Sequence, residues 1–167
     1  MIESQFNRGY IDMEGEMQLK EVIRLFRQIQ ETSSTNDKKA IITANKDNEL
    51  FKKCLKFLLD SNLVTGISSK KLGKKLSNMT FSTQDECHSF KEVMEYLLKH
   101  NSGKDYDIFA MQLFLKTVPE NDREFYEQMI TKKFKLGADK KVVNAVIPGL
   151  IPTWDIQQAY PLSEKNE

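Results

Sequence analysis

Apolar side chains recur at intervals of three and four residues along most of this chain, the spacing that places them on one face of an α-helix. Stretches rich in Ser, Thr, Asn and Gly, which form turns and helix caps, separate these runs. Almost no stretch alternates as a half-buried strand would. The pattern predicts an all-α fold, a compact bundle of about seven helices. We expect the helices at about 19–31, about 37–44, 45 or 47 to about 60, 90 to about 100, 105–117, 119 to about 134, and between Gly137 and Pro148.

Two stretches lack this periodicity. Residues 1–16 are acidic, contain two glycines and show no sustained period, so we expect an N-terminal extension ahead of a helical domain at 17–153. Residues 65–79 hold two glycines, several Ser and Thr residues and four lysines, which predicts an exposed loop. By contrast, the helix at 105–117 is apolar nearly all round and is expected to be central.

The composition is that of an ordinary soluble globular protein, with 40% hydrophobic and 29% charged residues in a chain of 167. No apolar run approaches the roughly 18 residues of a transmembrane helix, and the N-terminus has no signal-peptide pattern. A cytoplasmic protein with no membrane partner is therefore expected. Cys54 and Cys87 are too few for a disulfide framework, and neither they nor the two histidines show metal-ligand spacing. We expect two buried or half-buried thiols and no metal site.

The formal net charge of +1 conceals a segregation of charge along the chain. Residues 38–75 carry ten lysines against three acidic residues, whereas residues 84–127 carry ten acidic residues against five basic ones. Residues 132–141 return to five lysines against one aspartate. This distribution predicts basic surfaces on an otherwise acidic body, with plain solvated helix faces as the alternative.

The most informative segment is residues 132–152, where a basic approach leads to a glycine turn, a helix start and an apolar exit with two prolines. Asp139 is expected to cap the helix, and backbone amides at the helix start suit a phosphate group. Charged contacts would give affinity for DNA without sequence preference, and Asn144 would reach a sugar or a base edge. The candidate DNA-binding residues of this segment are Lys132, Lys135, Gly137, Lys140, Lys141 and Asn144. The alternative is a capping glycine followed by a solvated helix.

A second candidate surface is the loop that carries Lys70, Lys71, Lys74 and Lys75, whose glycine and serine residues would let it follow a phosphate backbone. Its alternative is a loop that is merely soluble. The apolar residues around the two prolines of 148–152 are expected to form a packed exit from the domain rather than a binding cage.

No motif for catalysis is visible in the sequence. The chain has neither GxxxxGK[ST] nor GxGxxG, and no Ser-His-Asp set or pair of carboxylates stands out. Asp105 and Asp107 lie at a predicted helix start, where capping accounts for them. Cys87 and His88 are adjacent and would point about 100° apart on a helix, which argues against a nucleophile and its base. No catalytic residue is expected in this chain.

The sequence resembles the N-terminal DNA-binding domain of ATP-dependent DNA ligases, in particular their bacteriophage-like branch. The strongest match is Lys135-Leu136-Gly137-Ala138, followed from Val143 by Asn-Ala-Val-Ile-Pro-Gly-Leu-Ile-Pro. Residues 46–52 are similar to a helix opening of that family, and residues 65–67 with the lysines after them give a weaker match. The likeness covers roughly residues 17–159.

The resemblance implies a helical domain that grips duplex DNA on both sides of a nick, ahead of the adenylation and OB-fold domains of the same parent chain. It places Gly137, Lys140, Lys141 and Asn144 on the DNA face, with the lysines at 70–75 nearby. ATP and magnesium would serve the parent enzyme, and no cofactor is expected in this chain. Residues 154–167 would begin the linker to the adenylation domain.

One departure from the family narrows the expected role. The catalytic lysine of the family lies in a Lys-x-Asp-Gly motif, and this chain contains no Asp-Gly. It cannot form the lysyl-AMP intermediate, so we expect a non-catalytic domain. It would be either part of a parent ligase that acts in DNA replication, repair and recombination, or a free-standing binding module. The leading rival is a helical protein-interaction module of a replication or repair assembly, which would dock through its segregated charges.

Overall fold

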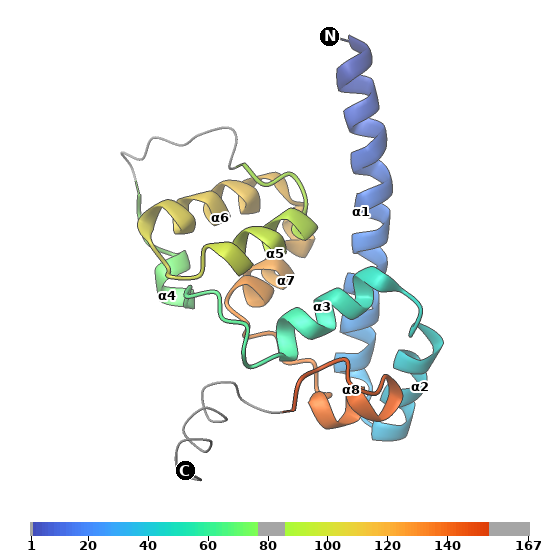
Figure 1. Ribbon diagram of the computed structural model, residues 1–167. Helices are drawn as coiled ribbons and strands as arrows, with labels where there is room; N and C mark the ends of the chain where they lie inside the picture. Colours follow the sequence, from blue (N-terminus) through green and yellow to red (C-terminus); the bar gives the residue numbers. More distant parts are fainter. Residues whose placement is uncertain (1, 77–85, 154–167) are drawn as a thin grey trace, which may run out of the picture. The chain divides into compact units, whose positions relative to one another are not determined.

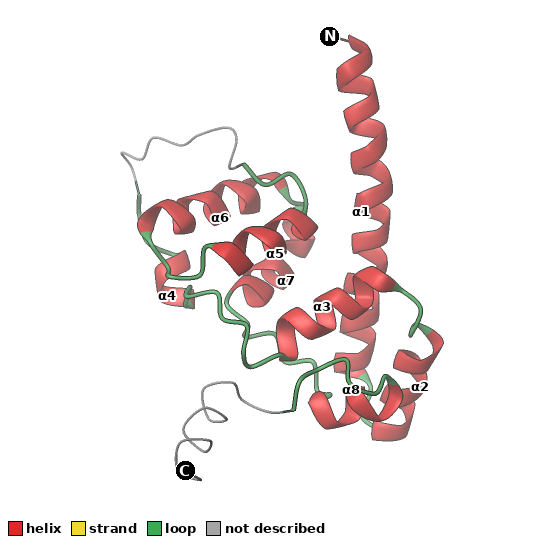
Figure 2. Ribbon diagram, in the orientation of Figure 1, coloured by secondary structure: helices red, strands yellow, loops and turns green. Residues whose placement is uncertain are grey.

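The computed structural model describes residues 2–76 and 86–153, with side chains from residue 14 onward. This part of the chain contains eight α-helices and no β-strand (Figure 1, Figure 2). The prediction of an all-α fold is confirmed. The helices are α1 (Ile2–Glu31), α2 (Thr35–Ala44), α3 (Glu49–Leu59), α4 (Ser69–Leu72), α5 (Phe90–Lys99), α6 (Asp105–Thr117), α7 (Glu120–Ile130) and α8 (Lys140–Val146).

Side-chain caps set where most of these helices begin. At five helix starts a side-chain oxygen accepts a hydrogen bond from the backbone amide three residues later, and the capping residues are Ser34, Asn48, Ser68, Ser89 and Asp139. Because the caps outweigh the apolar spacing, α2 begins earlier than predicted and α3 begins later. The predicted starts of α5, α6 and α8 agree with the structure.

Helix α1 begins at Ile2, so the predicted start at Leu19 is wrong. A helix that has already nucleated gains one hydrogen bond for each further residue, and Glu, Gln and Met have good helix propensity. The helix therefore continues through residues 2–16 without an apolar period. It also continues through two glycines, each of which costs about 1 kcal/mol relative to alanine.

The predicted exposed loop at 65–79 contains a short helix. Ser68 caps the single turn of α4, which ends at Gly73. Residues 77–79 of that predicted loop lie outside the described residues, as does the predicted linker at 154–167. Pro119 lies just before α7 and is not the first residue of that helix, where it was predicted to lie. Its side chain makes no capping hydrogen bond to the helix.

The chain divides into two compact units. The first unit comprises the residues up to Arg24 together with Val64–Phe134, and the second comprises Leu25–Leu63 with the residues from Lys135 onward. One division falls within α1, and another falls inside the basic segment 132–152. The predicted DNA-binding residues are therefore distributed over two units, each with its own buried core.

An aromatic cluster forms the core of the first unit. The ring centroid of Phe90 on α5 lies 5.3 Å from that of Tyr126 and 6.4 Å from that of Phe125, both on α7, and 6.5 Å from that of Phe114 on α6. Phe134 adds an edge contact with Phe125 at 5.4 Å. Aromatic pairs of this kind contribute about 0.5–1.5 kcal/mol beyond the burial of their surface. Helix α6, expected to be central, contacts both α4 and α7.

Helices α2, α3 and α8 build the second unit together with the last residues of α1. Phe26 and Phe51 are fully buried and meet edge to face, with their centroids 5.8 Å apart. Helix α2 packs against α8, and Ile42 and Val143 are fully buried. Ile151 is buried as well, whereas Ile147 and Leu150 are half-buried and Pro148 and Gly149 are exposed, so the apolar exit that follows α8 packs as predicted only at Ile151.

Both cysteines are free thiols and both are buried, as predicted. Desolvation by burial raises the pKa of Cys54 from 9.0 to about 12, and the nearby charge of Lys53 opposes that rise only in part. The thiolate is the reactive form of cysteine, so Cys54 is held in its unreactive form at neutral pH. Cys54 therefore serves the packing of the second unit.

Candidate nucleic-acid interface

The ten residues predicted to bind DNA fall into two groups, one on each unit. The first unit holds Lys70, Lys71, Lys74, Lys75 and Lys132. The second unit holds Lys135, Gly137, Lys140, Lys141 and Asn144. We call the four lysines at 70–75 the α4 lysine loop, and we call residues 135–141 the α8 basic turn.

The α8 basic turn is shaped by Gly137, whose φ of +82° lies in the left-handed region. The residues on either side, Leu136 and Ala138, are buried and fix the turn to the core. The ammonium group of Lys38, on α2, donates a hydrogen bond to the carbonyl oxygen of Gly137 at 2.8 Å. A Cβ on Gly137 would lie 2.9 Å from Lys38 Nζ, so the lysine packs directly over the glycine.

Lys38 brings to this turn a positive charge that the sequence pattern does not predict there. Lys38 and Gly137 are 99 residues apart, so no local spacing reports their contact. The only sequence signal is that Lys38 opens the lysine-rich stretch 38–75. Its half-buried side chain and its hydrogen bond make Lys38 a residue that holds the turn in shape.

Asp139 caps α8, which confirms that prediction. Its Oδ1 accepts a hydrogen bond from the backbone amide of Val142 at 3.0 Å. The carboxylate also places a negative charge at the helix start, where a phosphate would otherwise be favoured. The lysines of the α8 basic turn, rather than the backbone amides of α8, are therefore the groups suited to contact a phosphate.

The three lysines of the α8 basic turn keep their ammonium groups out of internal contacts. Lys135 and Lys141 are exposed, and Lys140 is half-buried. Within the described part of the chain, none of the three ammonium groups has a hydrogen bond or an ion pair. The backbone is nevertheless fixed, because the carbonyl oxygen of Lys135 accepts a hydrogen bond from Gln30 Nε2 at 2.8 Å. The turn thus presents positive charges from a held backbone.

Asn144 uses its amide group within the protein. Its Nδ2 donates to the carbonyl oxygen of Ile151 at 2.8 Å, and its Oδ1 accepts from the backbone amide of Ile151 at 2.9 Å. This pair of hydrogen bonds ties α8 to the Pro-Gly-Leu-Ile-Pro segment that follows it. Contact of Asn144 with a sugar or a base edge stays a prediction, and we leave this residue out of the proposed interface.

The lysines of the α4 lysine loop are all exposed, but they differ in their contacts. Lys71 Nζ donates to the carbonyl oxygen of Gly66 at 3.3 Å. Lys74 Nζ forms an ion pair with Asp105 Oδ1 at 2.8 Å. The other two lysines of the loop have no hydrogen bond or ion pair among the residues that the structure describes. The loop therefore offers two kinds of lysine to a ligand.

Lys132 contributes to the end of α7. Its φ of +57° places it in the left-handed region, which residues other than glycine rarely adopt. Its backbone amide donates to the carbonyl oxygen of Met129 at 3.0 Å, and its side chain is half-buried. We therefore assign Lys132 to the turn that closes α7, and its contact with DNA stays a prediction.

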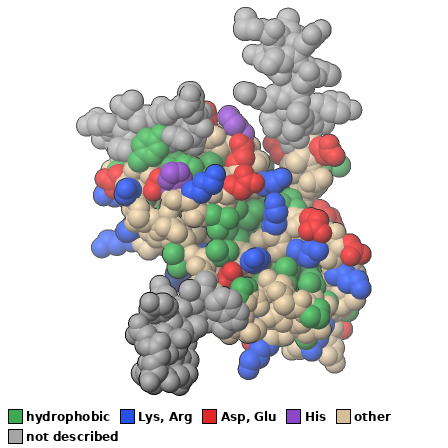
Figure 3. Space-filling view, viewed as in Figure 1, with side chains coloured by type: hydrophobic (Ala, Val, Ile, Leu, Met, Phe, Trp, Pro, Cys, Tyr) green, Lys and Arg blue, Asp and Glu red, His purple; other side chains and the backbone are tan. Residues whose placement is uncertain are grey.

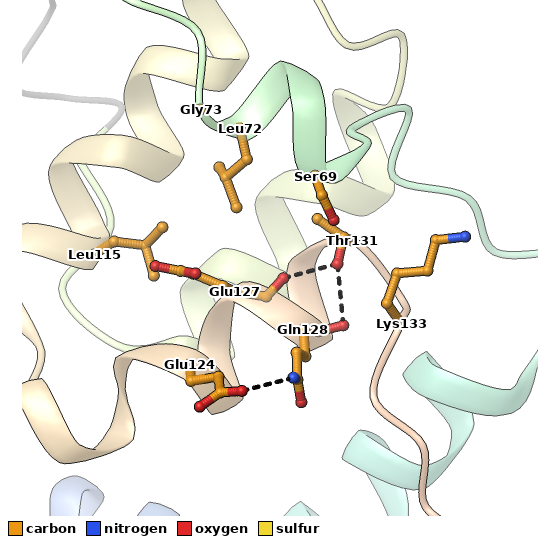
Figure 4. Close-up of a pocket in the computed structure, with 9 residues that line it drawn as sticks. All are labelled: Ser69, Leu72, Gly73, Leu115, Glu124, Glu127, Gln128, Thr131 and Lys133. Carbon is orange, nitrogen blue, oxygen red and sulfur yellow. Dashed lines mark hydrogen bonds between the residues drawn. The ribbon is translucent and has the colours of Figure 1, made fainter.

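A hollow of about 400 Å³ lies between α4 and α7 (Figure 4). Its lining comprises Ser69, Leu72, Gly73, Leu115, Glu124, Glu127, Gln128, Thr131 and Lys133. Gln128 Nε2 donates to Glu124 Oε1 at 3.1 Å, and the hydroxyl of Thr131 donates to the carbonyl oxygen of Glu127 at 2.9 Å. The wall carries two glutamates against one lysine, Lys133, so its net charge disfavours an anion and we do not expect a phosphate to enter this hollow.

Acidic and basic side chains are interspersed on the face shown in Figure 3. On α1, a hydrogen bond from Arg24 lowers the pKa of Glu21, and the two side chains form an exposed pair at 2.6 Å. Within residues 14–76 and 86–153, whose side chains the structure describes, no three His, Cys, Asp or Glu side chains gather in a way that could hold a metal ion. None of the described helices is both long and apolar enough to cross a membrane.

Comparison of the sequence with models of protein families gives no match, and a search of curated proteins finds none that is significantly similar. The resemblance to ATP-dependent DNA ligases therefore rests on the residues of the chain itself, above all on 135–152.

Proposed function

We propose that this chain binds duplex DNA without sequence preference, through lysines of the α4 lysine loop and the α8 basic turn. One observation carries the proposal. Five lysines have ammonium groups with no acidic partner within the described residues: Lys70, Lys75, Lys135, Lys140 and Lys141. Hydrogen bonds from Gln112 to the carbonyl oxygen of Lys74 and from Gln30 to that of Lys135 hold the backbone within the two surfaces. A lysine ammonium is a compact point charge that suits a phosphate oxygen and reads no base. Release of counterions from DNA then supplies the affinity.

The resemblance at 135–152 gives this binding a context. We infer that the chain is the N-terminal DNA-binding domain of an ATP-dependent DNA ligase. It would position a nick for joining by the adenylation and OB-fold domains of the same parent chain. The joining chemistry, with its ATP and magnesium, would belong to those domains, since the Lys-x-Asp-Gly motif is missing from this sequence.

Reversing the two charges of α8 should weaken DNA binding. The variant carrying Lys140→Glu and Lys141→Glu is expected to bind a nicked duplex about tenfold more weakly or worse, because each lost phosphate contact costs roughly one factor of ten near 0.1 M salt. The dissociation constant would be measured by fluorescence anisotropy on two duplexes of unrelated sequence. We expect the same loss on both, since phosphate contacts carry no sequence information.

A matched variant controls for net charge. Lys91→Glu with Lys99→Glu makes the same change in charge on exposed positions of α5, outside both proposed surfaces. It should weaken binding far less than the α8 variant. Equal losses for the two variants would show that only net charge matters and would remove the α8 basic turn from the proposal. If the unaltered protein binds neither nicked nor intact duplex, the protein-interaction module becomes the better interpretation.

A further inference from the structure

Two contacts inside the first unit use ammonium groups of the α4 lysine loop. Lys74 Nζ forms an ion pair at 2.8 Å with Asp105, the first residue of α6. Lys71 Nζ reaches back to the carbonyl oxygen of Gly66 at 3.3 Å. Each contact links the loop to a different neighbouring segment, so the two lysines hold the loop from two sides.

The loop is held a third time by Gln112, a half-buried residue of α6. Its Nε2 donates to the carbonyl oxygen of Leu72 at 3.0 Å and to that of Lys74 at 2.6 Å. One side chain thus connects the end of α4 with the backbone after Gly73. Among the described residues, neither carbonyl group accepts a backbone hydrogen bond, since α4 spans only Ser69–Leu72.

Lys71 also lies over a close crossing of two backbones. Gly66 and Gly103 both have positive φ, +72° and +69°. A Cβ on Gly66 would collide with the backbone oxygen of Asn101, and a Cβ on Gly103 would collide with the oxygen of Gly66. The same Cβ on Gly103 would lie 2.8 Å from Lys71 Nζ. The ammonium group of Lys71 therefore lies beside the point where the backbones at Gly66 and Gly103 cross, just before α4 begins.

We propose that the four lysines of the α4 lysine loop have two different roles. Lys71 and Lys74, together with Gln112 as a positioning residue, anchor the loop, whereas Lys70 and Lys75 contact DNA phosphates. The phosphate half of this inference rests on the proposed function, while the anchoring half stands without it. Lys71 and Lys74 would have to give up an existing partner to reach a phosphate, so their net gain is smaller. Holding the backbone beforehand lowers the ordering cost of the contacts made by Lys70 and Lys75.

Four single Lys→Met variants test the phosphate half, because each removes one charge from the same loop. For each protein, the affinity for a nicked duplex would be measured over a range of salt concentrations. Loss of a phosphate contact flattens the slope of log K against log salt by about 0.9. We expect that change for Lys70→Met and for Lys75→Met, and a change of less than about half that size for Lys71→Met and Lys74→Met. Equal flattening by all four variants would overturn this assignment of roles.

Trypsin tests the anchoring half without DNA. Gln112→Leu keeps every charge and removes the donor of both hydrogen bonds, so local opening should speed cleavage after Lys70 and Lys75 by about tenfold or more. Gln30→Leu is the matched control, since it too removes a glutamine donor from a lysine carbonyl group, that of Lys135. It should leave cleavage of the loop unchanged. Mass spectrometry of the fragments assigns each cut.

The DNA-binding and trypsin measurements can each contradict one half of the inference without the other. Equal loop cleavage in Gln112→Leu and the unaltered protein would overturn the anchoring, whatever the DNA measurements show. Absence of DNA binding by the unaltered protein would overturn the proposed function and the phosphate half with it, while the cleavage rates would still decide the role of Gln112.

Discussion

Replacing Phe90 by alanine is expected to lower the free energy of unfolding of the first unit by about 3–5 kcal/mol. Phe90 is 1% exposed, and its ring lies against Tyr126, Phe125 and Phe114 at centroid distances of 5.3, 6.4 and 6.5 Å. Truncation removes the buried surface and breaks three aromatic contacts. It also leaves a cavity between α5, α6 and α7, which these helices can close only in part. The shift would be measured by urea unfolding, followed by circular dichroism.

The control lies on the same helix. Leu98 is a large apolar residue of α5 that is 51% exposed, and Leu98→Ala should change stability by less than about 0.5 kcal/mol. Because the chain has two units, the unfolding curve of each variant should be compared transition by transition. A loss below about 1 kcal/mol for Phe90→Ala would contradict the aromatic cluster as the core of the first unit.

Replacing Gly66 by alanine is expected to cost about 2–5 kcal/mol, from two sources. Its φ of +72° is strained for any residue with a Cβ, and the added atom would meet the backbone of Asn101. Backbone atoms cannot move aside as a flexible side chain can, so the loops must separate. The same urea measurement reports the loss, and cleavage of the α4 lysine loop by trypsin should rise with it.

Two further glycines separate the sources of this cost. Gly149 has a φ of +77° and nothing within 4 Å of an added Cβ, so Gly149→Ala should show the conformational strain alone, about 1–2 kcal/mol. Gly73 has a negative φ of −87° and its nearest neighbours would be at 3.7 Å, an ordinary contact. Gly73→Ala should therefore leave stability unchanged or raise it by up to about 1 kcal/mol. If Gly66→Ala costs no more than Gly149→Ala, the two backbones do not cross closely.

The helices that could be predicted from the sequence are those whose start is marked locally. At α6, the apolar run gave bounds of 105–117, which the structure reproduces. At α8, the glycine turn and the capping aspartate did the same. The expected capping by Asp105 and Asp107 is wrong, because no side chain caps α6, Asp105 pairs with Lys74, and Asp107 is buried and accepts a hydrogen bond from the Tyr96 hydroxyl at 2.7 Å. Helix α1 could not be bounded in this way, because nothing in residues 2–16 marks an end and propagation needs no apolar period. A single turn such as α4 is too short to show a period at all.

The sequence shows where the positive charges of the candidate interface lie along the chain, but it does not show which of them already have partners in the fold. Lysine clusters are visible in the sequence, and the structure shows the four at 70–75 exposed. Which of them are already engaged depends on partners far along the chain, such as Asp105, 31 residues from Lys74. Lys38 and Gln112 were missed for the same reason. Asn144 was expected to face DNA, whereas its amide group binds Ile151, a contact that only the fold of the exit segment creates.

Binding of the unaltered protein to a nicked duplex, measured as a function of salt, tests the central claim most directly. If two or more lysines engage phosphates, the affinity should fall at least about tenfold between about 50 and 200 mM salt, with a straight line of log K against log salt. Anisotropy of a labelled duplex gives this curve. A flat response, or no binding at the lower salt concentration, would contradict the account.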